Sequence, residues 1–282
     1  MGRAWSDEQD AELKRLWEVH GGGFRKIGAA MGRSLGSISG RSRVLGLQFR
    51  GGRSHILEAS APAARHAHTV FPARVIAPDQ NVLKTGDNQR KLGKVVKKGA
   101  WRGFPIFSLT LEERATCPRS CEMWRQCYGN GMGHAKRYEF GAALERQISI
   151  ELAFLQRRHP GGFVVRLHIL GDFYSLPYVE FWRKALDYFP ALHVFGYTAR
   201  QTDTRIGAAI GHLRADRWDR FAVRTSGATS DSGVPRTLVF DGEPPPGAIV
   251  CPAQTGKTAN CASCALCWSA AARHRPIAFA QH

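Results

Sequence analysis

The chain has 282 residues, 43% of them hydrophobic, which is enough for one large domain with an apolar core and a second, small domain. The chain has 40 lysines and arginines but only 23 aspartates and glutamates, and the resulting net charge of +17 indicates a polyanionic partner. No apolar run is long enough to cross a bilayer and no export signal follows Met1, so we expect a soluble, cytoplasmic protein.

Residues 4–47 have the pattern of three short helices. Ser6 and Gln9 have the spacing of a capping box at the start of the first helix. A tight turn is predicted at residues 32–34, between the second and third helices, which makes this a helix-turn-helix arrangement. The apolar positions expected to face inward include Leu13, Leu16, Trp17, Ile27, Met31, Ile38 and Leu45.

The outward face of the third helix carries short polar and cationic side chains suited to base edges and phosphates in a major groove: Ser37, Ser39, Arg41 and Arg43. A short basic loop with Arg50 and Arg53 could follow DNA into the minor groove, although a solvated basic loop would have the same composition. We therefore predict that residues 1–50 bind DNA, with a three-helix bundle that has no DNA role as the alternative.

Part of this region is similar to a known family. Four segments resemble the DNA-binding domain of the GcrA family of alphaproteobacterial cell-cycle regulators, namely Trp5-Ser-Asp-Glu, Leu16-Trp17, Ile27-Gly-Ala-Ala and Gly40-Arg-Ser-Arg-Val-Leu-Gly-Leu47. The resemblance implies a third helix that contacts DNA. The chain departs from the family at Leu35-Gly36 and lacks its usual carboxy-terminal region, so the family's target sequence and partners are not carried over.

Residues 51–80 are rich in Ala, Pro, His and Arg, and we predict a flexible linker there. A basic stretch over residues 84–98 follows it, and either a DNA-backbone contact or an ordinary charged face would have this composition.

From Phe104 onward predicted strands and helices alternate, so residues 81–282 are predicted to form an α/β domain with a parallel sheet, as an open sheet or a partial barrel. Strands are predicted at 104–109, 163–170, 192–197 and 221–224, with short ones near Leu238 and Ile249. Apolar helical spacing predicts helices around 144–155, 178–186 and 206–213.

Ligands of parallel sheets bind at the carboxyl ends of the strands, where this sequence has Asp172, Arg200 and Arg224. We predict that these three converge on an anionic ligand, although a structural ion-pair network or a helix cap at Asp172 would use the same residues. His168 lies inside a predicted strand and is expected to be packed rather than reactive.

All seven cysteines fall into two groups, which indicates metal or covalent chemistry. In the second group Cys261, Cys264 and Cys267 are spaced as in ferredoxin-type runs, so we predict a [4Fe-4S] cluster with Cys251 as the fourth ligand. A zinc site is the alternative, and disulfides would require an oxidising compartment.

The first group is Cys117, Cys121 and Cys127. A three-cysteine loop ahead of strand-helix repeats is similar to radical S-adenosylmethionine enzymes, whose usual spacing of three then two residues differs from the three then five found here. Either these thiols leave one iron open, as an enzyme would need, or they supplement a single metal site.

The second half also resembles a family of mycobacteriophage gene-product-88 domains. The likeness rests on the motifs Cys117-Pro with Cys121 and Cys127-Tyr128, Arg166-Leu-His-Ile-Leu-Gly-Asp-Phe-Tyr174, Tyr197-Thr-Ala-Arg200, and Cys251-Pro-Ala-Gln254 with Cys261, Cys264 and Cys267-Trp268. It covers most of residues 85–275 and implies a phage or mobile-element origin.

The leading hypothesis from these patterns is a DNA-binding iron-sulfur protein, a transcriptional regulator of phage or mobile-element origin whose cluster is redox-sensitive or structural. One rival is an iron-sulfur enzyme, radical-type or otherwise redox-active, that acts on nucleic acid. The other is a zinc-stabilised DNA-binding protein.

Overall fold

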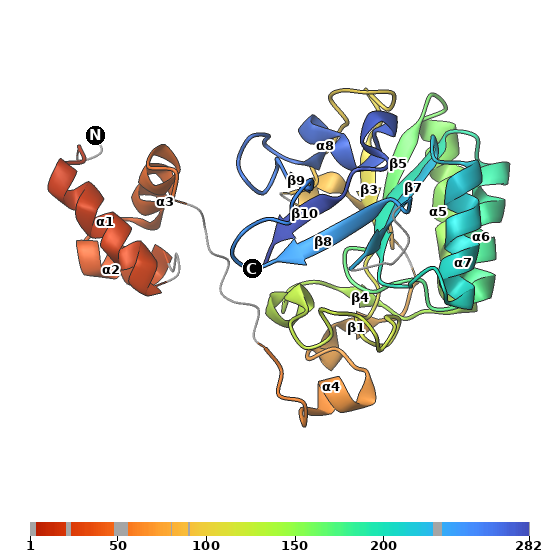
Figure 1. The fold of residues 1–282 in the computed structure, drawn as a ribbon, viewed down its shortest axis with the longest axis horizontal. Coiled ribbons are helices and arrows are strands. Elements are labelled where there is room, and N and C mark those ends of the chain that lie inside the picture. Colours follow the sequence, from red (N-terminus) through yellow and green to blue (C-terminus); the bar gives the residue numbers. More distant parts are fainter. Residues whose placement is uncertain are drawn as a thin grey trace. The chain divides into compact units, whose positions relative to one another are not determined.

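The computed structural model describes residues 4–20, 24–47, 56–79, 81–89, 91–227 and 233–281. The chain divides into two compact units. The smaller unit contains residues 1–56 together with 126–131 and residue 282, and the larger one contains residues 57–125 and 132–281 (Figure 1).

The smaller unit has three helices, α1 (Asp7–His20), α2 (Phe24–Met31) and α3 (Leu35–Val44). The predicted capping box is confirmed, because the Gln9 amide donates to Ser6 Oγ at 3.3 Å and the Ser6 amide donates to Gln9 Oε1 at 3.4 Å. Gly32, with a φ of +59°, forms the turn between α2 and α3. The apolar positions meet in one small core, made of Leu13, Leu16, Trp17, Ile27 and Ile38.

The larger unit is an α/β structure built on a mostly parallel sheet, as the alternating pattern predicted. Its eight strands lie in the order β2-β3-β5-β6-β7-β8-β10-β9, and only β2 and β3 are antiparallel. Because β2 and β9 form separate edges, the described sheet is open. The strands are β2 (Lys84–Thr85), β3 (Ile106–Ser108), β5 (Phe163–Leu167), β6 (Leu192–Thr198), β7 (Phe221–Ser226), β8 (Arg236–Phe240), β9 (Ile249–Val250) and β10 (Ile277–Ala280).

Three helices cover one face of this sheet: α5 (Ala142–Arg158), α6 (Leu176–Tyr188) and α7 (Arg205–Asp216) (Figure 1). Hydroxyl side chains cap two of them, with Ser175 Oγ accepting from the Tyr178 amide and Thr204 Oγ1 from the Gly207 amide. Their apolar faces pack on alternate strand residues, as in Ile148 of α5, to form the larger core. No helix among the described residues combines the length and apolar character needed to cross a bilayer.

The opposite face of the sheet packs against the carboxy-terminal segment that carries four of the cysteines. Alternate residues of the central strands, Val164, Phe195 and Ala222, form a second core with Trp101 and with Cys267. The short helix α8 (Cys261–Cys264) lies on this side (Figure 1). The sheet therefore separates a helix-covered face from a face that supports cysteines.

The structure departs from the sequence-based picture in two places. Strand β10, which no pattern predicted, lies between β8 and β9 and is parallel to both. Residues 57–79, which composition assigned to the linker, carry α4 (Pro62–His66) and β1 (Val75–Ile76), and β1 pairs with β4 (Arg137–Tyr138). Buried Leu57 belongs to this stretch, so it is part of the larger unit rather than a free tether.

Candidate metal centre

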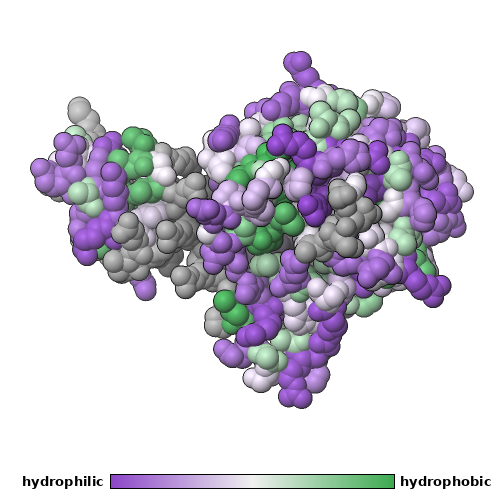
Figure 2. Space-filling model, in the orientation of Figure 1, coloured by the Kyte–Doolittle hydropathy of each residue, from purple (hydrophilic) through white to green (hydrophobic). Residues whose placement is uncertain are grey.

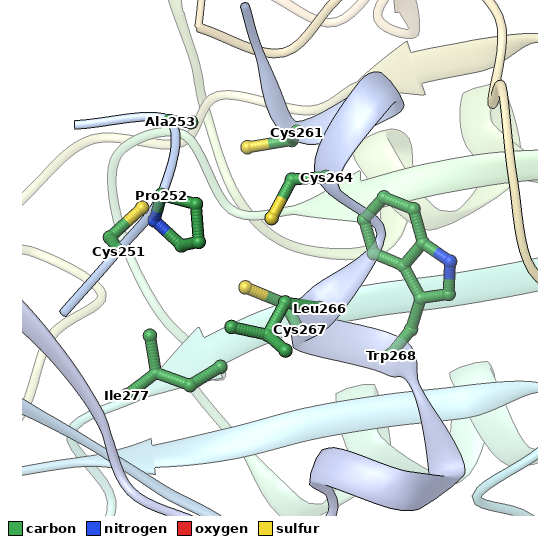
Figure 3. Close-up of a pocket in the computed structure, with 9 residues that line it drawn as sticks. All are labelled: Cys251, Pro252, Ala253, Cys261, Cys264, Leu266, Cys267, Trp268 and Ile277. Atoms are coloured by element: carbon green, nitrogen blue, oxygen red, sulfur yellow. The ribbon is translucent and has the colours of Figure 1, made fainter. Parts of the chain in front are cut away.

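The four cysteines of the carboxy-terminal group line one pocket. Figure 3 shows the sulfurs of Cys251, Cys261, Cys264 and Cys267 directed toward the same space. Apart from these thiols the lining is apolar. In the region of β9 and β10, Figure 2 shows a hydrophobic area flanked by hydrophilic residues.

Local backbone structure explains why three of these thiols converge. Asn260 begins α8 with a capping box, in which its side chain accepts from the Ser263 amide at 3.0 Å and Ser263 Oγ accepts from the Asn260 amide. One helical turn then puts Cys261 and Cys264 on the same side. Ala265, in the left-handed region with a φ of +59°, ends the helix, and a 3-10 turn at Leu266–Trp268 presents Cys267.

Cys251 reaches the pocket from a different element. It follows β9, and its amide donates to the carbonyl of Ala278 in β10 at 2.9 Å. The Gln254 side chain holds the next turn by donating to the Ala280 carbonyl at 2.7 Å and accepting from the Ala280 amide at 2.8 Å. The strand that the sequence did not predict therefore positions the fourth thiol.

The basic stretch before β3 also supports the cysteines. The amides of Cys261 and Ala262 donate to the carbonyls of Lys91 and Leu92 at 2.8 and 2.9 Å. Gly93 lies so close to α8 that a Cβ there would come within 3.0 Å of Asn260 and Ala262, and its φ is +82°. Backbone contacts of this stretch thus hold the cysteine helix, a role that its charge pattern did not reveal.

Burial makes three of these thiols weaker acids than a free cysteine. It raises the pKa of Cys261 to about 12 and that of Cys267 to about 11, and it also raises the pKa of Cys251. Neighbouring cysteines raise these three pKa values further. A bound metal would have to displace their protons, and nearby cations favour the resulting thiolates.

Three polar residues of the central strands lie beside the pocket cysteines. The Tyr197 hydroxyl lies 2.9 Å from Cys267 Sγ. The Arg166 guanidinium stacks over the Tyr197 ring at 4.4 Å, and it lowers the pKa of Cys261 against the effect of burial. Arg224 donates from Nε to the Cys267 carbonyl at 2.9 Å and from Nη2 to the Ala272 carbonyl at 2.8 Å.

The predicted ligand site of Asp172, Arg200 and Arg224 is not assembled as expected. Asp172 and Arg200 are neighbours, but Arg200 donates to the carbonyls of Phe173 and Thr116, both at 2.8 Å. Arg224 points to the cysteine side of the sheet, because side chains alternate along β7 and it shares the side of Ala222. The two arginines therefore serve separate backbone networks.

Asp172 and His168 belong to the buried structure beside these strand ends. Asp172 accepts from Thr198 Oγ1, the Ala199 amide and its neighbour's amide, each at 2.7 Å, yet burial raises its pKa to about 6. Its predicted role as a helix cap is wrong, because Ser175 caps α6. His168 is packed as predicted, with Nε2 3.1 Å from the Tyr178 hydroxyl and its pKa lowered to about 3 by burial.

The other three cysteines do not line the pocket and lie between β3 and β4. Cys117, Cys121 and Cys127 are half-buried, with the first two in the larger unit and Cys127 in a segment grouped with the smaller unit. Cys117 directly follows Thr116, whose hydroxyl accepts from the Asp172 amide at 3.0 Å. This loop thus starts at the carboxyl edge of β5.

The cysteines of both groups share one chemical state. All seven are free thiols in the structure. In the described ranges, no three His, Cys, Asp or Glu side chains are arranged to hold a metal ion as they stand. The pocket is a candidate centre on the strength of its four converging thiols and its apolar and cationic surroundings.

The predicted DNA-contacting residues have mixed positions. Arg41 Nε donates to Asp10 Oδ1 at 2.7 Å, and Arg41 Nη2 forms an ion pair with Asp10 Oδ2, so this guanidinium is held within the smaller unit. Ser37 and Ser39 are half-buried on α3. The side chain of Arg43, together with Arg50 and Arg53, lies outside the part of the chain that the structure describes.

Sequence reasoning missed that Arg166 and Tyr197 lie beside the cysteines. Both residues lie on buried strands among apolar residues. A polar side chain at a buried strand position was the feature of the sequence that could have marked them as site residues. Comparisons of the chain with protein-family models, curated proteins and solved structures found no match.

Proposed function

We propose that this chain is an iron-sulfur protein whose pocket of Cys251, Cys261, Cys264 and Cys267 holds a [4Fe-4S] cluster. The observation that carries the proposal is the convergence of four thiols from β9, α8 and the following turn on one apolar pocket. Iron-sulfur clusters in proteins are held by four cysteine thiolates in such surroundings.

Spacing and lining favour the cluster over zinc. Structural zinc is held most often by separate pairs of ligands, whereas three of these thiols come from one continuous C-x-x-C-x-x-C run. Cys261 and Cys267 lie within the sheet-facing core beside Trp268, where solvent access to the sulfurs is limited. Zinc is the competing outcome of the test below.

We further propose that the smaller unit is a helix-turn-helix domain that binds DNA and that the whole chain is a transcriptional regulator. The net charge of +17, the three-helix arrangement and the likeness to GcrA domains support this role. The likeness to gene-product-88 domains supports a phage or mobile-element origin. The free thiols suit a reducing compartment, so we place the protein in the cytoplasm.

Anaerobic purification of the full chain tests the cluster directly. We expect a brown protein with about four irons and four sulfides per filled site. Replacing Cys264 by Ser should remove the colour, whereas Ser269→Ala, a change just beyond the cysteine run, should keep it. Colourless protein with stoichiometric zinc would refute the iron-sulfur proposal in favour of a zinc-stabilised protein.

DNA binding is tested by fluorescence anisotropy with a random duplex. Affinity should fall as salt rises, because neutralised phosphates release counterions. If the full chain shows no salt-dependent binding at low ionic strength, the regulatory role is excluded while the cluster proposal stands.

One observation favours a second function, an iron-sulfur enzyme of radical or other redox type that acts on nucleic acid. The loop with Cys117 and Cys121 begins at the carboxyl edge of a parallel sheet, which is where α/β enzymes bind substrates. Buried Arg114 anchors this loop by donating from Nε to the Trp124 carbonyl at 3.0 Å.

Iron counting separates the two functions. A second cluster at this loop would roughly double the iron content, and Cys117→Ser would remove about half of the iron while leaving the signal of the pocket cysteines. Unchanged iron in Cys117→Ser would favour the regulator.

A further inference from the structure

Two buried cations border the four-cysteine pocket without a carboxylate partner. Arg166 is 9% exposed and Arg224 is fully buried. Among the described residues neither forms an ion pair with an aspartate or glutamate, and both donate to backbone carbonyls instead. Burying an uncompensated charge costs several kcal/mol, so a nearby anion would stabilise these two guanidinium groups.

The thiol pocket supplies that anion once its cysteines are deprotonated. The Arg166 guanidinium lies 4.4 Å from the centre of the Tyr197 ring, whose hydroxyl contacts Cys267 Sγ, and Arg224 Nε donates to the Cys267 carbonyl at 2.9 Å. Lys91 adjoins the same cysteines, because its carbonyl accepts from the Cys261 amide at 2.8 Å. Cations thus approach the pocket from β5, β7 and the segment before β3.

Tyr197 adds a directed hydrogen bond to this charge. Its hydroxyl lies 2.9 Å from Cys267 Sγ, and a metal-bound thiolate has no proton, so the tyrosine must then be the donor. Arg166 over the ring face and Phe279 at the ring edge hold the side chain in place. A hydrogen bond to a cluster sulfur stabilises the more negative state and raises the reduction potential.

We infer that the four-cysteine centre is a one-electron redox site, and that Tyr197, Arg166 and Arg224 stabilise its reduced form. The inference rests on the proposed cluster and assigns it a redox role rather than a purely structural one. A low-potential donor such as a reduced flavin or iron-sulfur protein gives up one electron, and the centre becomes more negative by one charge. No covalent bond forms or breaks, and Tyr197 keeps its proton.

The test is an anaerobic redox titration of the full-length holoprotein, followed by EPR and absorption. Wild type should accept one electron per cluster, and Tyr197→Phe should titrate at a more negative potential because the donated hydrogen bond is lost. Tyr174→Phe is the matched control. It also removes a hydroxyl with a defined partner, Glu145 at 2.7 Å, but on the helix-covered side of the sheet, so its potential should equal that of wild type.

Three results would overturn the inference: a cluster in wild type that dithionite and photoreduced flavin do not reduce, an unchanged potential in Tyr197→Phe, or an equal shift in both tyrosine variants. If Tyr197→Phe fails to assemble the cluster, Arg166→Gln is titrated instead. Its reduction potential should be more negative than that of wild type, and an unchanged potential would contradict the inference. Iron and sulfide analysis of wild type comes first, because absence of iron there refutes the proposed cluster itself.

Discussion

Arg224 is expected to hold the last cysteine of the pocket in place through backbone contacts. Its guanidinium donates to four carbonyls, those of Cys267 at 2.9 Å, Ala272 at 2.8 Å, Arg275 at 3.1 Å and Arg273 at 3.3 Å. Replacing it by methionine keeps an unbranched apolar side chain and removes every donor. The segment from residue 267 to residue 275 then loses its main polar anchor to the sheet.

The size of the effect follows from the two shortest contacts. Hydrogen bonds from a charged donor contribute roughly 1.5–3 kcal/mol each, so two of them amount to about 3–6 kcal/mol. The variant no longer buries a cation, which offsets part of this loss. A net destabilisation of about 3 kcal/mol corresponds to a Tm decrease of roughly 6–12 °C for a unit of this size.

Arg220→Met is the matched control, because Arg220 also caps backbone carbonyls, those of Leu186 at 2.8 Å, Phe189 at 2.7 Å and Leu192 at 3.1 Å. Those carbonyls belong to α6, the turn after it and the first residue of β6, away from the cysteine segment. Thermal melts followed by circular dichroism should show a lower Tm for both variants, while iron content should fall only in Arg224→Met. Equal iron in the two variants would refute the reasoning.

Three further outcomes are expected. Burial raises the pKa of Asp172 from its ordinary 3.8 to about 6, so wild type should lose stability as the pH rises from about 4 to above 6. In urea unfolding, the stability advantage of wild type over Asp172→Asn should shrink across that pH range, and a constant difference would contradict a buried carboxyl with a raised pKa. Asp10→Asn frees Arg41, so anisotropy titrations should show tighter duplex DNA binding at low salt, and weaker binding would mean that the ion pair positions α3 for contact. The pKa values of about 12 for Cys261 and about 11 for Cys267 predict that zinc binding to the metal-free protein at pH 7.5 releases protons. Calorimetric titration in buffers of different ionisation enthalpy counts the released protons, and a count of zero would show that the thiols are already ionised.

Local patterns in the sequence were sufficient for much of the fold. The capping box at Ser6 and the apolar stripe of α5 depend on residues three or four positions apart, so they can be read without tertiary information. The same holds for β5, β6 and β7, which are rich in apolar residues because a parallel sheet buries both faces. Grouping Cys261, Cys264 and Cys267 required only their spacing along the chain.

Only the tertiary structure could decide which distant residues share the pocket. Strand β10 (Ile277–Ala280), which the sequence pattern did not predict, pairs with β8 on one side and β9 on the other. Its Ala278 carbonyl fixes the backbone at Cys251. The sequence also grouped Arg224 with Asp172 because both follow or end strands. Side chains alternate between the two faces of a strand, so a position near a strand end does not say which face a residue serves, and the pleat of β7 directs Arg224 to the cysteines.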